Sequence, residues 1–278
     1  IFNQDYNTNT FTAFVQDTYH PIEHLALHFG FKSVLSTTRV GNGYANPDYY
    51  GAGTQLASGV GLTTAKAFLP HISADRQFLQ HHELFFDISE NVHTYAQCGY
   101  KLCASPFAVT QTAFEAGQSS FRPETDWTYA VGYRYSSERV GLSLYGYRTN
   151  FNNRLQQVTS GSSVNPISTV ANVGGVTMNG VDAALTIMPI RNLMFTNSLS
   201  YDHATYDNNI TEAGTIYHLK GAQIVNYPRY MYKTRLSYDW KGLTAYIDAS
   251  YNSRRNFSYT GDVKVPSYWL SNLGIQYN

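Results

Sequence analysis

The two cysteines, Cys98 and Cys103, are residues whose type and spacing could do chemistry. Four residues separate them, and the 278-residue chain holds no further cysteine, so a site of four thiolates is excluded. A cysteine nucleophile would need a paired histidine, and none is identifiable from the sequence. The spacing leaves open a local disulfide in an oxidising compartment or two free thiols. We favour the disulfide, which would pin the base of a loop.

Nine histidines could in principle ligate a metal ion, but their spacing predicts no metal site. His81 and His82 are adjacent, so in a strand they point to opposite faces. His20 and His24 flank a short turn, and zinc needs several ligands that converge at about 2.0–2.3 Å. We therefore interpret the histidines as polar turn residues.

Many enzyme active sites have motifs with a characteristic spacing. The chain has no Gly-x-Ser-x-Gly elbow, no phosphate-binding glycine loop and no His-Glu-x-x-His motif of zinc proteases. The sequence therefore predicts no catalytic residue, no cofactor and no enzyme.

Aromatic residues in glycine-rich segments are better candidates for contacts with a ligand. Aromatic rings can stack on a bulky ligand or hold a cation, and arginines near a strand end can attract an anion. The candidate ligand-binding residues are Tyr44, Tyr49, Tyr50, Tyr95, Tyr100, Phe107, Arg148 and Arg154, with Phe114 beside them. The alternatives are loop packing or a membrane girdle for the aromatics, and an ion pair at the rim for the arginines.

Strands must position these candidates, because apolar and polar residues alternate with period two along most of the chain. In 126–136, Trp127, Val131 and Tyr135 fall on one face, opposite Asp126 and Arg134. Helical periodicity appears nowhere over a useful length, and no apolar run approaches the about 20 residues of a transmembrane helix. About eleven strands are predicted, at roughly 11–20, 23–38, 66–76, 82–97, 123–136, 139–156, 170–188, 192–207, 227–239, 242–257 and 265–278.

The composition disfavours nucleic acid as a partner. Lys and Arg number 19 and Asp and Glu number 19, so the chain lacks the basic excess of a nucleic-acid-binding protein. Charged residues make up 14% of the chain, against about 25% in soluble domains. Aromatic residues are abundant at 15%.

The connections between the predicted strands alternate in length. Short turns such as 189–192 and 239–242 alternate with long links such as 39–65 and 98–122, so the long loops all emerge at one end. Many predicted strands exceed the about 5–6 residues usual in globular proteins. Aromatic residues gather near strand ends, as in the girdles of transmembrane barrels. The pattern favours an antiparallel transmembrane β-barrel over a soluble β-rich domain.

Several segments, in order along nearly the whole chain, resemble the C-terminal barrel region of TonB-dependent outer-membrane receptors. They include FTAFVQDTYHPIEHLALHFGFKS (11–33), AKAFLPHISADRQF (65–78), FRPETDWTYAVGYRY (121–135), NVGGVTMNGVDAALTIMP (172–189) and VPSYWLSNLGIQY (265–277). The resemblance implies short periplasmic turns, long extracellular loops and a multi-pass barrel in the outer membrane of a Gram-negative cell. In such receptors the ligand is held by the outer loops and the upper plug.

The resemblance also implies function and partners. Residues 1–278 would form part of a barrel, because eleven strands are about half of the family's ~22. The family's plug domain and the last strands of its barrel are not visible in this sequence. The partners would be outer-membrane lipid, the TonB complex through the missing plug region, and a small molecule such as a ferric siderophore. The receptor would take up that nutrient with energy from TonB. The alternatives are a passive porin and an outer-membrane barrel enzyme.

The alternation makes one prediction about the faces of the sheet. Val131 should face lipid and Gly132 the interior. We therefore expect Val131→Arg to be costly and Gly132→Arg to be tolerated better.

Overall fold

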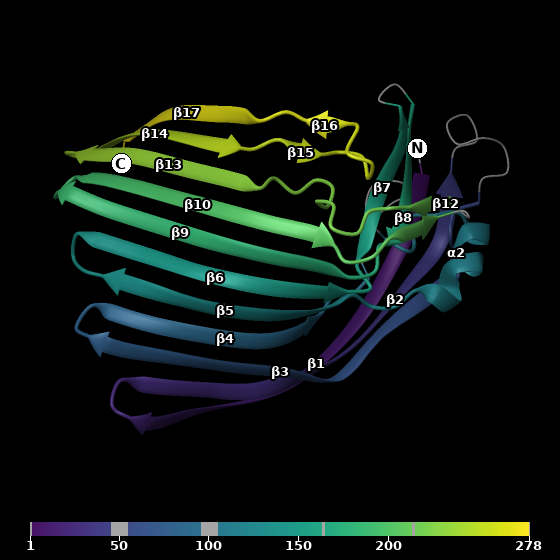
Figure 1. Cartoon of the computed structure of the whole chain (residues 1–278), viewed down its shortest axis with the longest axis horizontal. Helices are drawn as coiled ribbons and strands as arrows, with labels where there is room; N and C mark the ends of the chain where they lie inside the picture. The colour runs from purple at the N-terminus through teal and green to yellow at the C-terminus, as the bar shows by residue number, and fades with distance from the viewer. Residues whose placement is uncertain (1, 46–54, 96–104, 163–164, 213–214, 278) are drawn as a thin grey trace.

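The computed structural model describes residues 2–45, 55–95, 105–162, 165–212 and 215–277. One antiparallel sheet of eleven strands dominates it, in the order β1-β2-β3-β4-β5-β6-β9-β10-β13-β14-β17 (Figure 1). The strands are β1 (Phe2–Ile22), β2 (Leu25–Ala45), β3 (Val60–Leu79), β4 (His82–Val92), β5 (Thr125–Ser136), β6 (Val140–Asn152), β9 (Val176–Ile190), β10 (Leu193–Tyr206), β13 (Tyr230–Trp240), β14 (Leu243–Asn252) and β17 (Tyr268–Tyr277). The predicted long antiparallel strands are confirmed.

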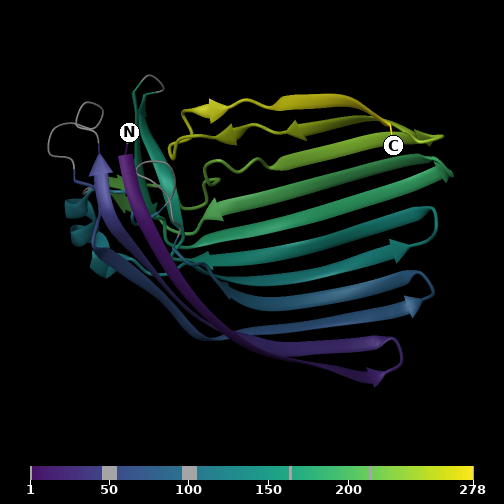
Figure 2. The ribbon, with the colours of Figure 1, turned by 180° about the vertical axis from the view of Figure 1, so that it is seen from behind.

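The two ends of the sheet differ as the lengths of the connections predicted. Short hairpin turns lie at one end, on the left in Figure 1, and the longer connections lie at the other. Figure 2 shows β1 and β2 sweeping towards the long-loop end, where they approach the helical segment. Strands β1 and β17 form the two edges and do not pair with each other among the described residues.

Short elements in the long loops were not predicted. They are the hairpins β7 (Leu155–Ser162)–β8 (Asn165–Asn172) and β11 (Ile210–Glu212)–β12 (Thr215–Tyr217), the pair β15 (Arg255–Asn256)–β16 (Lys264–Val265), helix α2 (Gln111–Gly117) and a 3₁₀ turn (Gln118–Ser120). Helix α2 begins at Thr110, whose Oγ1 accepts a hydrogen bond from the Ala113 amide at 3.3 Å. It is too short to display a helical period. No helix within the described ranges is both long and apolar enough to cross a membrane.

The turn between β13 and β14 illustrates how the short connections form. Lys241 and Gly242 have φ angles of 47° and 84°. Positive φ at both central positions is typical of the tight hairpin turn whose twist matches that of its strands. Gly242 adopts this conformation without a Cβ clash.

The sheet has one polar and one apolar face. Directly paired residues share a face, and Arg134 on the polar face forms ion pairs with Asp75 and Glu83. On the other face, Val131 and Leu199 are 60% and 46% exposed. Aromatic rings lie near both ends of the apolar face. Tyr201 packs on Tyr230 at 5.1 Å near the long loops, and His82 packs on Tyr135 at 4.9 Å near the short turns.

Gly132 lies on the polar face as expected, but its surroundings correct the prediction that it would tolerate arginine. A Cβ at this position would lie 2.3 Å from Phe85 Cζ and 2.6 Å from Tyr145 Cβ. The Phe85 ring is itself held beneath the Arg134 guanidinium, 4.0 Å from the ring centroid. The aromatic rings occupy the space that a side chain at residue 132 would need.

We therefore expect Gly132→Ala alone to lower the free energy of unfolding by about 1–3 kcal/mol, the usual cost of overpacking. Adding Phe85→Leu should recover part of the loss, because it removes the ring atoms that a Cβ would meet. Urea unfolding of the single and double variants measures both effects. A double variant no more stable than Gly132→Ala would contradict this packing.

Two hydrophobic clusters organise the long loops. The Phe107 cluster consists of Val40, Ala57, Leu62, Tyr95, Phe107 and Phe114. The Tyr206 cluster consists of Val173, Val176, Ala204, Tyr206, Ile210, Leu219, Ile224, Val225 and Tyr259. Ala204 and Tyr206 alternate along β10 with apolar-face residues such as Tyr201 and His203. The loops therefore fold over the polar face at the long-loop end.

Candidate ligand-binding face and its charged rim

A row of polar side chains crosses the polar face close to the loops. Lys32 Nζ donates a hydrogen bond to Asn91 Oδ1 at 3.1 Å, and Asn91 Nδ2 donates to Asp126 Oδ1 at 3.3 Å. His93 Nε2 lies 2.9 Å from Asp126 Oδ2. Strands β2, β4 and β5 supply these residues, except His93, which directly follows β4. The row links three strands near the level where the sheet meets its loops.

The same row continues to the base of the β7–β8 hairpin. Glu124 Oε1 lies 3.5 Å from Arg154 Nη1, and Glu124 Oε2 accepts a hydrogen bond from the Leu155 amide at 3.3 Å. The Arg154 guanidinium also lies 4.3 Å from the centroid of the Phe151 ring. We call Lys32, Asn91, His93, Glu124, Asp126 and Arg154 the charged rim.

Burial and pairing determine the charge of the rim. The Asp126 side chain is only 7% exposed, whereas the His93 side chain is 54% exposed. The hydrogen bond to Asp126 raises the pKa of His93 above its ordinary value of 6.5, and the nearby Glu124 carboxylate adds to this, against partial burial, which lowers it. His93 is therefore protonated at a higher pH than an ordinary histidine.

The raised pKa of His93 predicts a pH-dependent anchor at the base of the β4–β5 loop. A histidine with a raised folded-state pKa stabilises fully below the unfolded pKa of about 6.5 and loses this contribution as pH rises through the folded-state pKa. Because the side chain is more than half exposed, the effect should be at most about 1 kcal/mol.

Urea unfolding at pH 6 and pH 8 checks this expectation. His93→Gln should flatten the pH dependence, and His81→Gln, at a short turn, serves as the matched control. An unchanged pH dependence in His93→Gln would contradict the assignment.

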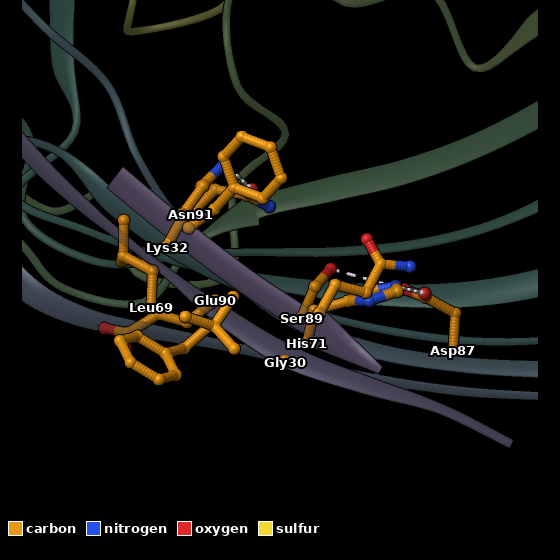
Figure 3. A pocket seen from close by; sticks show the side chains of 12 residues that line it. Gly30, Lys32, Leu69, His71, Asp87, Ser89, Glu90 and Asn91 are labelled. Atoms are coloured by element: carbon orange, nitrogen blue, oxygen red, sulfur yellow. Dashed lines mark hydrogen bonds and ion pairs between the residues drawn. The ribbon is translucent and has the colours of Figure 1, made fainter. Parts of the chain in front are cut away.

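A hollow of about 350 Å³ lies beside the rim on β1–β4 (Figure 3). Lys32 and Asn91 meet at one part of it. At another, His71 Nε2 lies 2.7 Å from Asp87 Oδ2, and Ser89 Oγ donates to Asp87 Oδ1 at 3.2 Å. The hollow offers hydrogen-bond donors and acceptors to a polar ligand. Within the described ranges, no group of three or more His, Cys, Asp or Glu residues is placed to hold a metal ion.

Comparison with known proteins decides the family. The family model described as "TonB dependent receptor-like, beta-barrel" matches residues 1–278. The chain belongs to this family. Receptors of this family reside in the outer membrane of Gram-negative bacteria, and the family is one of receptors rather than enzymes. No curated protein matches the chain.

Solved structures have the same fold as this receptor barrel. The siderophore receptor PiuA from Acinetobacter baumannii aligns with a TM-score of 0.72 at 15% identity, over 99% of this chain and 37% of that one. The ferric citrate transporter FecA aligns with a TM-score of 0.67 at 15% identity, over 99% and 38%. The copper transporter OprC aligns with a TM-score of 0.66 at 13% identity, over 99% and 40%. The chain thus spans less than half the length of each.

Membership of the family identifies which face of the receptor barrel meets lipid and which end carries the extracellular loops. The polar face lines the lumen and the apolar face meets lipid, because a barrel wall is apolar outside and polar inside. The short turns are periplasmic and the long loops extracellular. The charged rim therefore lies at the extracellular end of the lumen wall.

The aromatic candidates in the receptor loops fall into two groups. Tyr95 and Phe107 are 6% and 0% exposed, and with Phe114 they form part of the Phe107 cluster. Their rings pack against the loop core. Tyr44 lies at the extracellular end of β2, with its Cα paired to that of Asn3. Tyr49, Tyr50, Tyr100, Cys98 and Cys103 lie outside the described residues, so the disulfide stays a prediction.

The two candidate arginines lie on opposite faces of the receptor wall. Arg154 belongs to the charged rim and forms the ion pair considered as its alternative role. Arg148 alternates along β6 with Tyr147 and Thr149, which face the lumen, and pairs with Tyr129 on the lipid face. The Arg148 side chain therefore points away from the lumen.

Sequence reasoning missed most of the charged rim. Lys32, His93 and Glu124 were not among the candidates, and Asp126 was identified only as a residue of the polar face. The available signal was the position of polar residues next to long loops: His93 precedes 98–122, and Glu124 follows it. Their contacts across strands depend on register, which the sequence did not reveal.

Proposed function

We propose that this chain forms part of the wall of an outer-membrane receptor that takes up a ferric siderophore with energy from TonB. The observation that carries the proposal is the charged rim, where ionisable groups are held at the extracellular end of the lumen beneath packed loops. Lys32, whose hydrogen-bond partner Asn91 is neutral, gives the rim a cationic group that suits an anionic, oxygen-rich ligand. PiuA is a siderophore receptor and FecA a ferric citrate transporter, which supports iron as the cargo.

The partners follow from the same proposal. Residues 1–278 would be barrel wall throughout, in contact with lipid on the apolar face. The TonB complex would act through a plug region that lies outside these residues. The match of a barrel model to all of residues 1–278 supports this division.

The loop tyrosines are proposed to contact the ligand. Tyr44, Tyr49, Tyr50 and Tyr100 belong to or adjoin long extracellular loops, where aromatic rings can stack on a bulky siderophore. If so, alanine at Tyr49 or Tyr50 should raise the KM of uptake. Cys98 and Cys103 are proposed to form a disulfide at the base of their loop, which peptide mapping with and without reductant checks.

Uptake by iron-starved cells tests the proposed function. Cells that express the gene encoding this chain should accumulate radioactive iron from siderophores, and uptake should stop without TonB or with a protonophore. Copper is assayed in parallel, because OprC is a copper transporter. Uptake that persists without TonB and without the proton gradient would instead favour the passive porin.

A further inference from the structure

The lipid-facing surface becomes polar near the extracellular ends of three neighbouring strands. The change occurs from Gly146 to Arg148 on β6, from Val181 to Asn179 on β9, and from Tyr201 to His203 on β10. Below the change, exposed apolar side chains such as Leu144 and Leu199 form the band that meets lipid. A switch of this kind marks the level of the lipid headgroups.

The polar side chains at this level form one patch. Arg148 and Asn179 are direct Cα partners across β6 and β9, and Asn179 and His203 are partners across β9 and β10. Arg148 Nε donates a hydrogen bond to Asn150 Oδ1 at 3.0 Å. We call Arg148, Asn150, Asn179 and His203 the Arg148 patch.

An aromatic pair adjoins the Arg148 patch on β5. Trp127 and Tyr129 stack with ring centroids 6.3 Å apart and planes 21° apart. Tyr129 is the Cα partner of Arg148, and Trp127 is the partner of Asn150. Aromatic side chains of this kind anchor a barrel at the membrane interface, next to the headgroups.

Among the described residues, no carboxylate forms an ion pair with Arg148. Two lumen-facing arginines, Arg134 and Arg154, each have a carboxylate partner. Within the part of the chain that the structure describes, neither Arg148 nor His203 forms an ion pair, and Arg148 bonds only the neutral Asn150 side chain. The carboxylate of Asp207, just beyond the end of β10, is engaged by Thr177 instead of Arg148: its Oδ2 accepts a hydrogen bond from Thr177 Oγ1 at 3.1 Å.

We infer that the Arg148 patch binds the phosphate group of a lipid in the outer leaflet. A guanidinium group presents paired donors that match phosphate oxygens, and the neighbouring amide and imidazole groups add further donors. The apolar band directly below would hold the acyl chains of the same lipid. The inference rests on the placement of the barrel in the membrane and is independent of the cargo in the lumen.

The number of lipid A molecules that remain bound to the detergent-extracted protein tests the inference. The probe is diphosphoryl lipid A, titrated into detergent-solubilised protein without siderophore and counted by native mass spectrometry. Arg148→Gln should reduce retained lipid A about fivefold, the effect of one basic residue at an anionic membrane surface. The matched control is Arg76→Gln, an arginine on the same face near the periplasmic turns, which should retain lipid A like the parent protein.

Two results would overturn the inference. The first is unchanged lipid A retention in Arg148→Gln, or an equal loss in Arg76→Gln. The second is displacement of lipid A by millimolar inorganic phosphate, which would assign the patch to free phosphate. Equal urea midpoints for the variants and the parent exclude misfolding as the cause of a loss. Because no siderophore is present, a negative result for lipid A binding is independent of the result of the uptake experiment.

Discussion

Replacing Leu199 by arginine should prevent most of the protein from assembling in the outer membrane. Leu199 lies on the lipid face of β10 and is 46% exposed, and its Cα partners Ala183 and Tyr232 share that face. Arginine on the lipid face of a barrel costs about 2–4 kcal/mol near the midplane, because the charge is buried in hydrocarbon. The measurement is the fraction of protein in outer membranes that migrates as the folded, heat-modifiable form.

The neighbouring residue supplies the control for this prediction. Ser200 points into the lumen beside its Cα partner Asp182, and Asp202 lies two residues along the same face. An arginine there meets carboxylates and water instead of lipid, so Ser200→Arg should assemble close to normally. Ser200→Arg is a better matched control than Gly132→Arg, because there is no room for a side chain at Gly132. Equal assembly defects in Leu199→Arg and Ser200→Arg would contradict the assignment of the faces.

Replacing Phe107 by alanine should loosen the extracellular loops. The Phe107 side chain is fully buried. Its ring stacks on Phe114 with centroids 5.7 Å apart and meets the Tyr6 ring edge to face at 6.1 Å. Truncating a buried phenylalanine costs about 3–5 kcal/mol through lost burial and the cavity left behind. The measurement is the rate at which protease cleaves the loops of the folded protein, which should rise sharply.

A second variant at this position, Phe107→Leu, separates loop packing from ligand contact. Phe107→Leu keeps most of the buried volume and should retain most of the protease resistance, because it leaves a smaller cavity. If Phe107 instead acted through its aromatic ring on a ligand, Phe107→Leu would weaken uptake while the loops stayed resistant. Resistance in Phe107→Ala equal to that of the parent would contradict the packing role.

The pattern of residues along the chain was enough to predict the wall of the receptor. Period-two alternation identified the long strands and placed Val131 and Gly132 on opposite faces, because side chains in a strand alternate whatever the neighbouring strand is. The alternating short and long connections placed all long loops at one end. Motif order pointed to the family, which the family match confirms.

Only the tertiary structure decided which candidates are accessible. Tyr95 and Phe107 are of the residue type that stacks on ligands, yet the loops bury both side chains. Their burial depends on segments far apart in the sequence, which the local pattern does not reveal. Gln4 on β1, for example, donates hydrogen bonds from Nε2 to the carbonyls of Ala57 and Phe107 at 3.2 and 3.3 Å. Helix α2 was missed because its short length leaves no period to detect.

The contrast between Arg148 and Arg154 shows why the tertiary structure was needed to place each candidate residue. Both are arginines near the extracellular end of β6, so residue type and position along the chain made them equivalent candidates. Strand register places Arg148 on the lipid face, as the direct Cα partner of Tyr129. Arg154 lies beyond the end of the strand and forms an ion pair with Glu124. The sequence by itself determined the alternation, the strands and the end that carries the loops. Pairing between distant segments decided the charged rim, the buried aromatics and the face of each arginine.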